Sequence, residues 1–174
     1  MSGLIRLMYV SRATFEPVPV SQGIEPNIAR ILMHSRNHNP SHNLSGVLYY
    51  GDGYFFQCLE GQSGEVNRLM ARIVQDNRHT DVKIVRVVPI HDRLFEDWSM
   101  RYIPVEERVA DMLNNHGLES FHPDQFNDQL IDELVQLFST MVGSKTESSQ
   151  FEDENLPQKQ RTLWQRMFGF KRNN

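Results

Sequence analysis

The feature that most constrains the fold is a pair of apolar segments separated by a glycine-rich turn. "LSGVLYY" (44–50) and "YFFQCLE" (54–60) are rich in apolar and aromatic residues, and "GDG" lies between them. This pattern predicts two antiparallel strands joined by a tight hairpin loop. Both strands are apolar on both sides, so other parts of the chain must cover both faces of their sheet.

Gln57 interrupts the second of these strands with a side-chain amide. Burying an unpaired amide costs about 1–3 kcal/mol, so the chain must provide a partner for it. Neighbouring residues of a strand point to opposite sides of the sheet, and we therefore expect Gln57 and Cys58 to lie in different layers.

Periodicity and turn residues indicate the remaining elements. The β-branched run over 82–90 predicts a mostly buried strand. A helix that starts at Pro26 and stops before Pro40 would bury Ile28, Ile31, Leu32 and Ser35. Further strands are predicted over 4–13 and 98–104, and a second helix follows Ser63. The order β-α-β-β-α-β-β is that of an α+β, ferredoxin-like sheet with both helices on one face.

The other face of the sheet needs a second cover. Residues 105–142 read as two helices, the second with apolar residues at helical spacing: Phe126, Leu130, Leu134, Leu137, Phe138 and Met141. We therefore divide the chain into a body over 1–104, a C-terminal helical cap over 105–142, and a polar linker with a basic tail over 143–174. For the tail, a disordered end or a protein contact is favoured over a membrane-surface helix.

Composition excludes several classes of protein. There is no apolar run long enough to span a membrane and no signal peptide, so we expect a cytoplasmic protein. The single cysteine, Cys58, rules out a disulfide framework and a multi-cysteine metal site. The net charge is −4 although residues 157–174 hold five basic and no acidic residues, so the body is acidic and is not expected to bind nucleic acid directly.

The residues themselves argue against a metal site and against a reactive cysteine. His34, His38 and His42 have helical spacing, but the predicted helix ends before His42 and no acidic or cysteine ligand supports a metal site. Cys58 lies in an apolar strand, which raises the pKa of a thiol and makes it inert. We expect neither a metal site nor an enzyme.

A third interpretation concerns polar residues that point between the two helices and the sheet. They are Tyr9, Asn39, Gln57, Arg72 and Asp76, the last two as an i,i+4 pair on the second helix. A hydroxyl and two amides can bind the edge of a planar heteroaromatic ring, and Arg72, Arg78 and His79 could contact a phosphate. Periodicity alone leaves open whether these residues form a site or are separately satisfied polar groups.

Several long motifs are familiar in this order and spacing. "LMYVSRA", "RNHNPSHNLSGVLYYGDGYFFQCLEG", "RIVQDNRHTDVKIV" and "FEDWSMRYI" resemble the BLUF family of blue-light sensors that use flavin. The resemblance runs over residues 4–103 and implies a short BLUF protein whose C-terminal helices pack on the sheet face opposite the flavin.

The resemblance also implies roles for individual residues. Tyr9 matches the photoactive tyrosine that donates an electron and a proton, and Gln57 matches the glutamine whose hydrogen bonds switch. Asn39 matches the residue that holds the pyrimidine side of the ring, His38 is its neighbour at the ring edge, and Ile31 packs on the ring plane.

Other matched positions lie at the edges of the site. Arg72, Asp76, Arg78 and His79 correspond to positions around the ribityl-phosphate end. Trp98 and Met100 match a pair proposed to exchange places near the glutamine. Some members carry tryptophan next to the glutamine where this chain has Cys58, so a role for an aromatic there is absent.

The function implied by the resemblance is blue-light sensing with non-covalently bound FAD, or FMN as the alternative. Light would rearrange the hydrogen bonds of Gln57, and the signal would pass to a downstream regulatory protein, with the chain as a homo-oligomer. The alternative is a flavin-free ferredoxin-like module for binding or oligomerisation.

Overall fold

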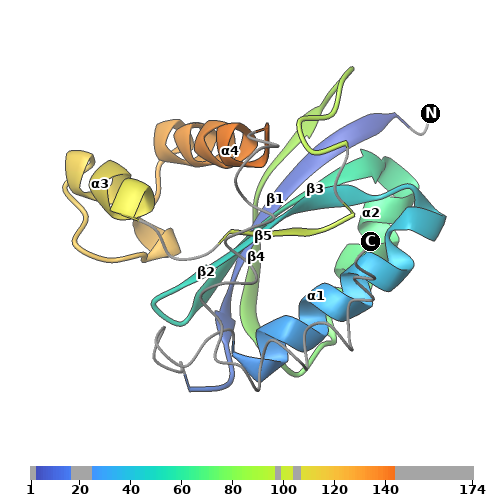
Figure 1. The fold of residues 1–174 in the computed structure, drawn as a ribbon, viewed down its shortest axis with the longest axis horizontal. Helices are drawn as coiled ribbons and strands as arrows, with labels where there is room; N and C mark the ends of the chain where they lie inside the picture. Colours follow the sequence, from blue (N-terminus) through green and yellow to red (C-terminus); the bar gives the residue numbers. More distant parts are fainter. Residues whose placement is uncertain (1–2, 17–24, 97–98, 104–106, 144–174) are drawn as a thin grey trace, which may run out of the picture.

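The fold was taken from a computed structural model that describes residues 3–16, 25–96, 99–103 and 107–143. Its elements are β1 (Leu4–Ala13), α1 (Pro26–His38), η2 (Pro40–His42), β2 (Ser45–Gly51), β3 (Tyr54–Gln62), α2 (Ser63–Val74), β4 (His79–Pro89), β5 (Arg101–Ile103), α3 (Glu107–Asn115), η3 (Pro123–Gln125) and α4 (Asp128–Gly143). The strands form one five-stranded sheet in the order β4-β1-β3-β2-β5 (Figure 1). The predicted ferredoxin-like α+β fold is confirmed.

The sheet is a central layer with helices on both sides. Figure 1 shows α1 and α2 on one side and α3 and α4 on the other. The apolar residues accordingly form two buried clusters, one under α1 and α2 that contains Leu7, Leu48 and Leu59, and one under α3 and α4 that contains Phe56 and Cys58. We call these the α1/α2 side and the α3/α4 side.

Local sequence explains where the main elements begin and end. The carboxylate of Glu25 accepts hydrogen bonds from the backbone N–H groups of Asn27 and Ile28, which caps the N-terminus of α1. Asn39, the residue before Pro40, closes the helix. In the β2–β3 turn, Asp52 and Gly53 have φ values of 51° and 80°, which a tight hairpin requires.

The expectation that residues 82–90 form a mostly buried strand is wrong. β4 lies at the edge of the sheet, where Ile84 and Val87 are 51% and 50% exposed. A β-branched run indicates a strand, but its burial depends on its place in the strand order, which is set by contacts far apart in sequence.

Two further expectations about helices need correction. Asp76 does not share a helix with Arg72, because α2 ends at Val74 and Asp76 lies in the loop that follows. Phe126 precedes α4, although its ring contacts Phe121 edge-on with centroids 5.0 Å apart. Pro123 starts a separate short helix that interrupts the expected longer one.

Candidate functional site

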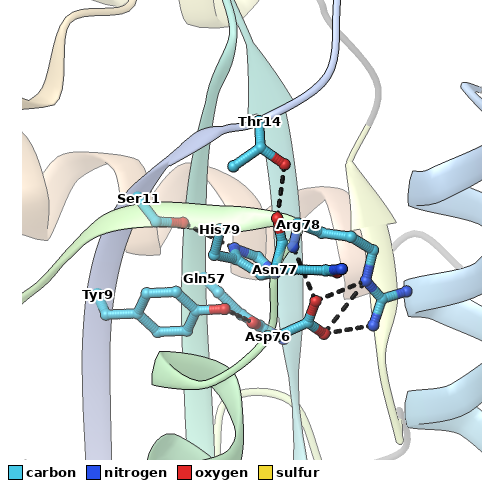
Figure 2. Close-up of polar contacts among 8 residues, drawn as sticks. All are labelled: Tyr9, Ser11, Thr14, Gln57, Asp76, Asn77, Arg78 and His79. Atoms are coloured by element: carbon cyan, nitrogen blue, oxygen red, sulfur yellow. Dashed lines mark hydrogen bonds and ion pairs between the residues drawn. The ribbon is translucent and has the colours of Figure 1, made fainter.

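The centre of the site is a pair of residues on neighbouring strands. Tyr9 on β1 lies directly opposite Gln57 on β3, and its hydroxyl donates a hydrogen bond to Gln57 Oε1 (Figure 2). Tyr9 is 0% and Gln57 is 3% exposed, so the amide that looked costly in the sequence is buried with a partner. Burial raises the pKa of Tyr9, and the carboxylate of Asp76 raises it further.

The other end of the Gln57 amide contacts the chain just before β5. Gln57 Nε2 donates a hydrogen bond to Met100 Sδ at 3.2 Å, and Met100 is buried on the α1/α2 side. A thioether sulfur is a weak acceptor, so this donor is held much less firmly than the acceptor that faces Tyr9. Trp98, the other residue of the expected pair, lies outside the described residues.

The end of α1 holds the same segment from the opposite direction. The side chain of Asn39, which is buried, donates from Nδ2 to the carbonyl oxygen of Ser99 at 2.6 Å. Arg36 Nε donates to the carbonyl oxygen of Met100 at 3.2 Å. Residues 99 and 100 are therefore fixed between α1 and Gln57.

His79 lies beside Tyr9 at the start of β4. Its Nδ1 is hydrogen-bonded with Ser11 Oγ at 2.8 Å, and its ring meets Tyr9 edge-on with centroids 6.3 Å apart (Figure 2). The ring also packs on Phe55, 4.5 Å away. Burial lowers the pKa of His79 to about 4, so the imidazole next to Tyr9 is neutral at pH 7.

Asp76 and Arg78 form an ion pair in the loop between α2 and β4. Arg78 Nε lies 2.8 Å from Asp76 Oδ1, a second guanidinium nitrogen contacts Oδ2, and the Arg78 N–H caps the same carboxylate at 3.0 Å. The hydrogen bond from the Arg78 side chain lowers the pKa of Asp76 to about 2, and Asp76 raises the pKa of Arg78. This fixed pair places charge within electrostatic reach of Tyr9 and His34.

The remaining expected residues lie on the helices. Ile31 is buried on α1 against the sheet, whereas Arg72 is exposed on α2. His38 is exposed, stacks on His34 with ring centroids 4.0 Å apart, and hydrogen-bonds through Nδ1 with the His34 carbonyl at 2.8 Å. His42 instead pairs with Glu65 at 3.2 Å, and no group of three metal-binding side chains occurs in the part of the chain that the structure describes.

Three participants were missed by reasoning from the sequence: Ser11, Arg36 and Ser99. Ser11 could have been found, since it follows Tyr9 by two residues and so shares its face of β1. Arg36 contacts the carbonyl of Met100, and the carbonyl of Ser99 contacts Asn39, each across about sixty residues of chain. No local pattern in the sequence indicates such contacts.

The donor and acceptor groups suit a planar heteroaromatic ring. The amides of Gln57 and Asn39 each combine a donor and an acceptor on a flat group, and the Gln57 donor is directed only to a sulfur. A ring carbonyl or ring nitrogen is a better acceptor than this sulfur. The arrangement can therefore bind such a ring and exchange hydrogen bonds with it.

Comparison with known proteins gives a consistent result. A family model described as BLUF, sensors of blue-light using FAD, matches residues 4–101. Photoactivated adenylate cyclase subunit alpha of Euglena gracilis is 40% identical over 131 residues, or 69% of this chain and 12% of that protein. Photoactivated adenylate cyclase subunit beta of Euglena longa is 34% identical over 100 residues, or 57% of this chain and 11% of that protein. The chain spans about an eighth of these relatives' length or less.

Solved structures resemble the fold over most of its length. BlsA in its photo-activated state superposes with a TM-score of 0.70 at 31% identity, covering 78% of this chain and 94% of BlsA. The dark-state structure of BlrB, a BLUF protein, gives a TM-score of 0.66 at 26% identity, covering 81% of this chain and 98% of BlrB. The likeness extends over nearly the whole of both neighbours.

Proposed function

The chain belongs to the BLUF family of flavin-binding blue-light sensors, and from this premise we propose that Tyr9 and Gln57 form its light switch. The observation that carries the proposal is the buried hydrogen bond from Tyr9 to Gln57, whose amide also reaches Met100. One small planar group thus links the photochemical residue to the chain that leads into β5.

Tyr9 is the electron and proton donor in this proposal. When bound, the flavin supplies the absorption of blue light and an excited ring that accepts an electron. Tyr9 gives up an electron and then its hydroxyl proton, and it regains both when the charges recombine. Because burial raises its pKa, Tyr9 is a neutral phenol before illumination and has a proton to give.

Gln57 stores the result as a changed set of hydrogen bonds. Its Oε1 accepts from Tyr9 at the start, and loss of the Tyr9 proton removes that donor. The amide would then rotate or tautomerise, leave the weak contact with the Met100 sulfur and present its donor to the edge of a bound ring. A hydrogen bond there would red-shift the absorption, and the change at Met100 would be the signal.

We assign the flavin contacts to residues around this switch. Ile31 would pack on the ring, Asn39 and His38 would hold its pyrimidine side, and Arg72, Asp76, Arg78 and His79 would contact the ribityl-phosphate end. We take FAD as the flavin because the description of the family names it, with FMN as the alternative. The ion pair of Asp76 and Arg78 supports this assignment, because it leaves guanidinium N–H groups on a fixed side chain near the site.

The chain itself acts as a sensor rather than an enzyme in this proposal. Residues 1–104 form the photosensor, 105–142 the helical cap, and 143–174 a polar linker and basic tail, with the output received by a partner protein. The cyclase relatives fuse similar sensors into much longer proteins, which supports a sensor role. Sedimentation in the dark and under blue light tests the expected homo-oligomer, and one unchanged monomeric species in both would contradict it.

The decisive experiment is Gln57→Leu, which replaces the amide with an apolar side chain of similar size. We expect the purified variant to be yellow and to show no red shift on illumination. Cys58→Ala is the matched control, because Cys58 neighbours Gln57 but faces the α3/α4 side, and we expect it to retain the full shift. A normal red shift in Gln57→Leu would show that the switch lies elsewhere.

A further inference from the structure

Residues 90–96 follow β4 and residues 99–100 precede β5, and we call these two described segments the first and second half of the connector. Phe95 is fully buried in the cluster under α3 and α4, whereas Met100 is buried in the cluster under α1 and α2. The connector therefore touches both layers of the molecule within a few residues. The contacts that hold the connector therefore determine which neighbouring elements move when Met100 is displaced.

Glu60 on β3 holds the first half of the connector. Its carboxylate is fully buried and accepts hydrogen bonds from the backbone N–H groups of Leu94 and Phe95, at 3.1 Å and 3.0 Å. Arg6, directly opposite on β1, donates to the same carboxylate from Nε at 2.6 Å. A buried carboxylate with this many charge-assisted hydrogen bonds is strongly fixed.

Arg93 adds a second tie at the same place. It donates to the carbonyl oxygen of Asn43 at 2.7 Å and to Ser45 Oγ at 3.4 Å, and Ser45 lies opposite Glu60 in the sheet. The first half of the connector thus rests on a row of residues across three strands. None of these contacts is needed to bind a ring on the α1/α2 side.

The same strand holds both halves of the connector. Gln57 and Glu60 lie three residues apart on β3 and so face opposite sides of the sheet. Gln57 contacts Met100 in the second half, and Glu60 contacts Leu94 and Phe95 in the first half. Beyond Met100 the chain enters β5, which pairs with β2 over only three residues, Arg101–Ile103.

We propose that Glu60 is a positioning residue that gives the signal its direction. With Leu94 and Phe95 fixed, a displacement of Met100 cannot be absorbed by the first half of the connector and moves β5 instead. Ile103 at the end of β5 lies in the cluster under α3 and α4, so the displacement reaches the C-terminal helices. This inference rests on the proposed function, in which the change at Gln57 is what displaces Met100.

The test is Glu60→Gln, followed by hydrogen exchange in the dark and under blue light. The variant replaces one acceptor oxygen with an NH2 group and so cannot hold both N–H groups as the carboxylate does. We expect the flavin red shift to persist, the light-dependent change in exchange over β5, α3 and α4 to be lost, and a new change to arise over residues 90–96. The matched control is Arg6→Lys, which keeps a cation beside the buried carboxylate and leaves both acceptors, and it should keep the wild-type pattern of exchange.

The outcomes separate this inference from the proposed function. Absence of a red shift in the wild-type protein would contradict both the proposed function and the role of Glu60. A wild-type red shift with no light-dependent change over β5, α3 and α4, or with an unaltered change in Glu60→Gln, would overturn only the role of Glu60.

Two further measurements guard against a misfolded variant. In the wild type, the Leu94 and Phe95 amides must be equally protected in the dark and in the light, and faster exchange in the light would overturn the proposal. If Glu60→Gln does not fold, the double variant Arg6→Gln/Glu60→Gln removes the clamp without leaving Arg6 unpaired. It should show the same redistribution of exchange.

Discussion

The two sides of the sheet are buried to a similar degree but are built from different chemistry. Under α3 and α4 aliphatic side chains surround a group of packed aromatic rings, in which Tyr49 is stacked on Phe138 at 5.6 Å and tilted on Phe121 at 4.6 Å between ring centroids. Under α1 and α2 the apolar residues surround buried polar groups, above all Tyr9 and Gln57.

The difference shows how one sheet can serve two purposes. Aromatic packing contributes stability without depending on the position of any one hydrogen atom. The polar pair contributes little net stability, since its hydrogen bonds replace hydrogen bonds with water, but it has more than one way to be satisfied. We therefore expect substitutions on the α3/α4 side to change stability and substitutions on the α1/α2 side to change the response to light.

The largest effect on stability should come from the α3/α4 side. Phe138 is fully buried and contacts both Tyr49 and Phe56. Phe138→Ala should lower the free energy of unfolding by about 3–5 kcal/mol, measured by urea denaturation, because it leaves a cavity. The folded fraction should keep its red shift, and Leu137→Ala, at a half-buried neighbour, should cost less. A folded variant without the shift would show that the two sides are not separable.

The second prediction concerns acid and the α1/α2 side. Burial holds the pKa of His79 in the folded protein at about 4, below its ordinary value, and the charges of Asp76 and Arg78 also act on it, in opposite directions. As the pH falls, His79 therefore binds a proton in the unfolded chain before it does so in the folded protein. The stability that neutral His79 contributes above pH 6.5 should decrease by about 3 kcal/mol by pH 4.

Urea denaturation at several pH values measures this dependence. His79→Asn keeps a group that can hydrogen-bond with Ser11 but does not titrate, so its stability should be less sensitive to pH over this range. An identical pH dependence in wild type and variant would assign the acid sensitivity to other groups.

Tyr9→Phe should separate stability from photochemistry. It removes the only hydroxyl that donates to Gln57 Oε1 among the described residues, which should cost about 1–3 kcal/mol in stability. The flavin should remain bound, but the red shift should disappear. Tyr50→Phe is the matched control, because the buried Tyr50 hydroxyl has no hydrogen-bond partner within the described ranges. That variant should be no less stable and should keep the shift; a normal photocycle in Tyr9→Phe would remove Tyr9 from the mechanism.

The smallest effect is expected where β4 meets α4 at the surface. Arg86 on β4 contacts Asp132 on α4 at 2.7 Å, but the Asp132 side chain is 58% exposed. Arg86→Gln should therefore lower stability by only about 0.2–1 kcal/mol and leave the light response unchanged. Lys83→Gln, at a longer and more exposed pair with Asp124, should have less effect still. A loss above this range would mean that the edge strand helps to hold α4.

The order and type of the elements could be predicted from the sequence, because periodicity and turn residues act locally. The strand over Leu4–Ala13, the β2–β3 hairpin and the end of α1 before Pro40 all follow from such signals. The failures have different causes. The exposure of β4 depends on how distant segments meet. The error at Asp76 is local, because α2 ends at Val74 and Asp76 pairs with Arg78 in the loop that follows. The linker and basic tail predicted over 143–174 lie almost wholly outside the described residues.

The sequence by itself determined that Gln57 would lie in an apolar strand, and that Cys58 would face the other layer, because side chains alternate along a strand. Only the tertiary structure decided what satisfies the amide. Tyr9 is opposite Gln57 because of the register between β1 and β3, and Met100 reaches it because the connector is held by α1 and Glu60. The contacts of Gln57 with Tyr9 and with Met100 join residues more than forty positions apart, and no local pattern fixes their geometry.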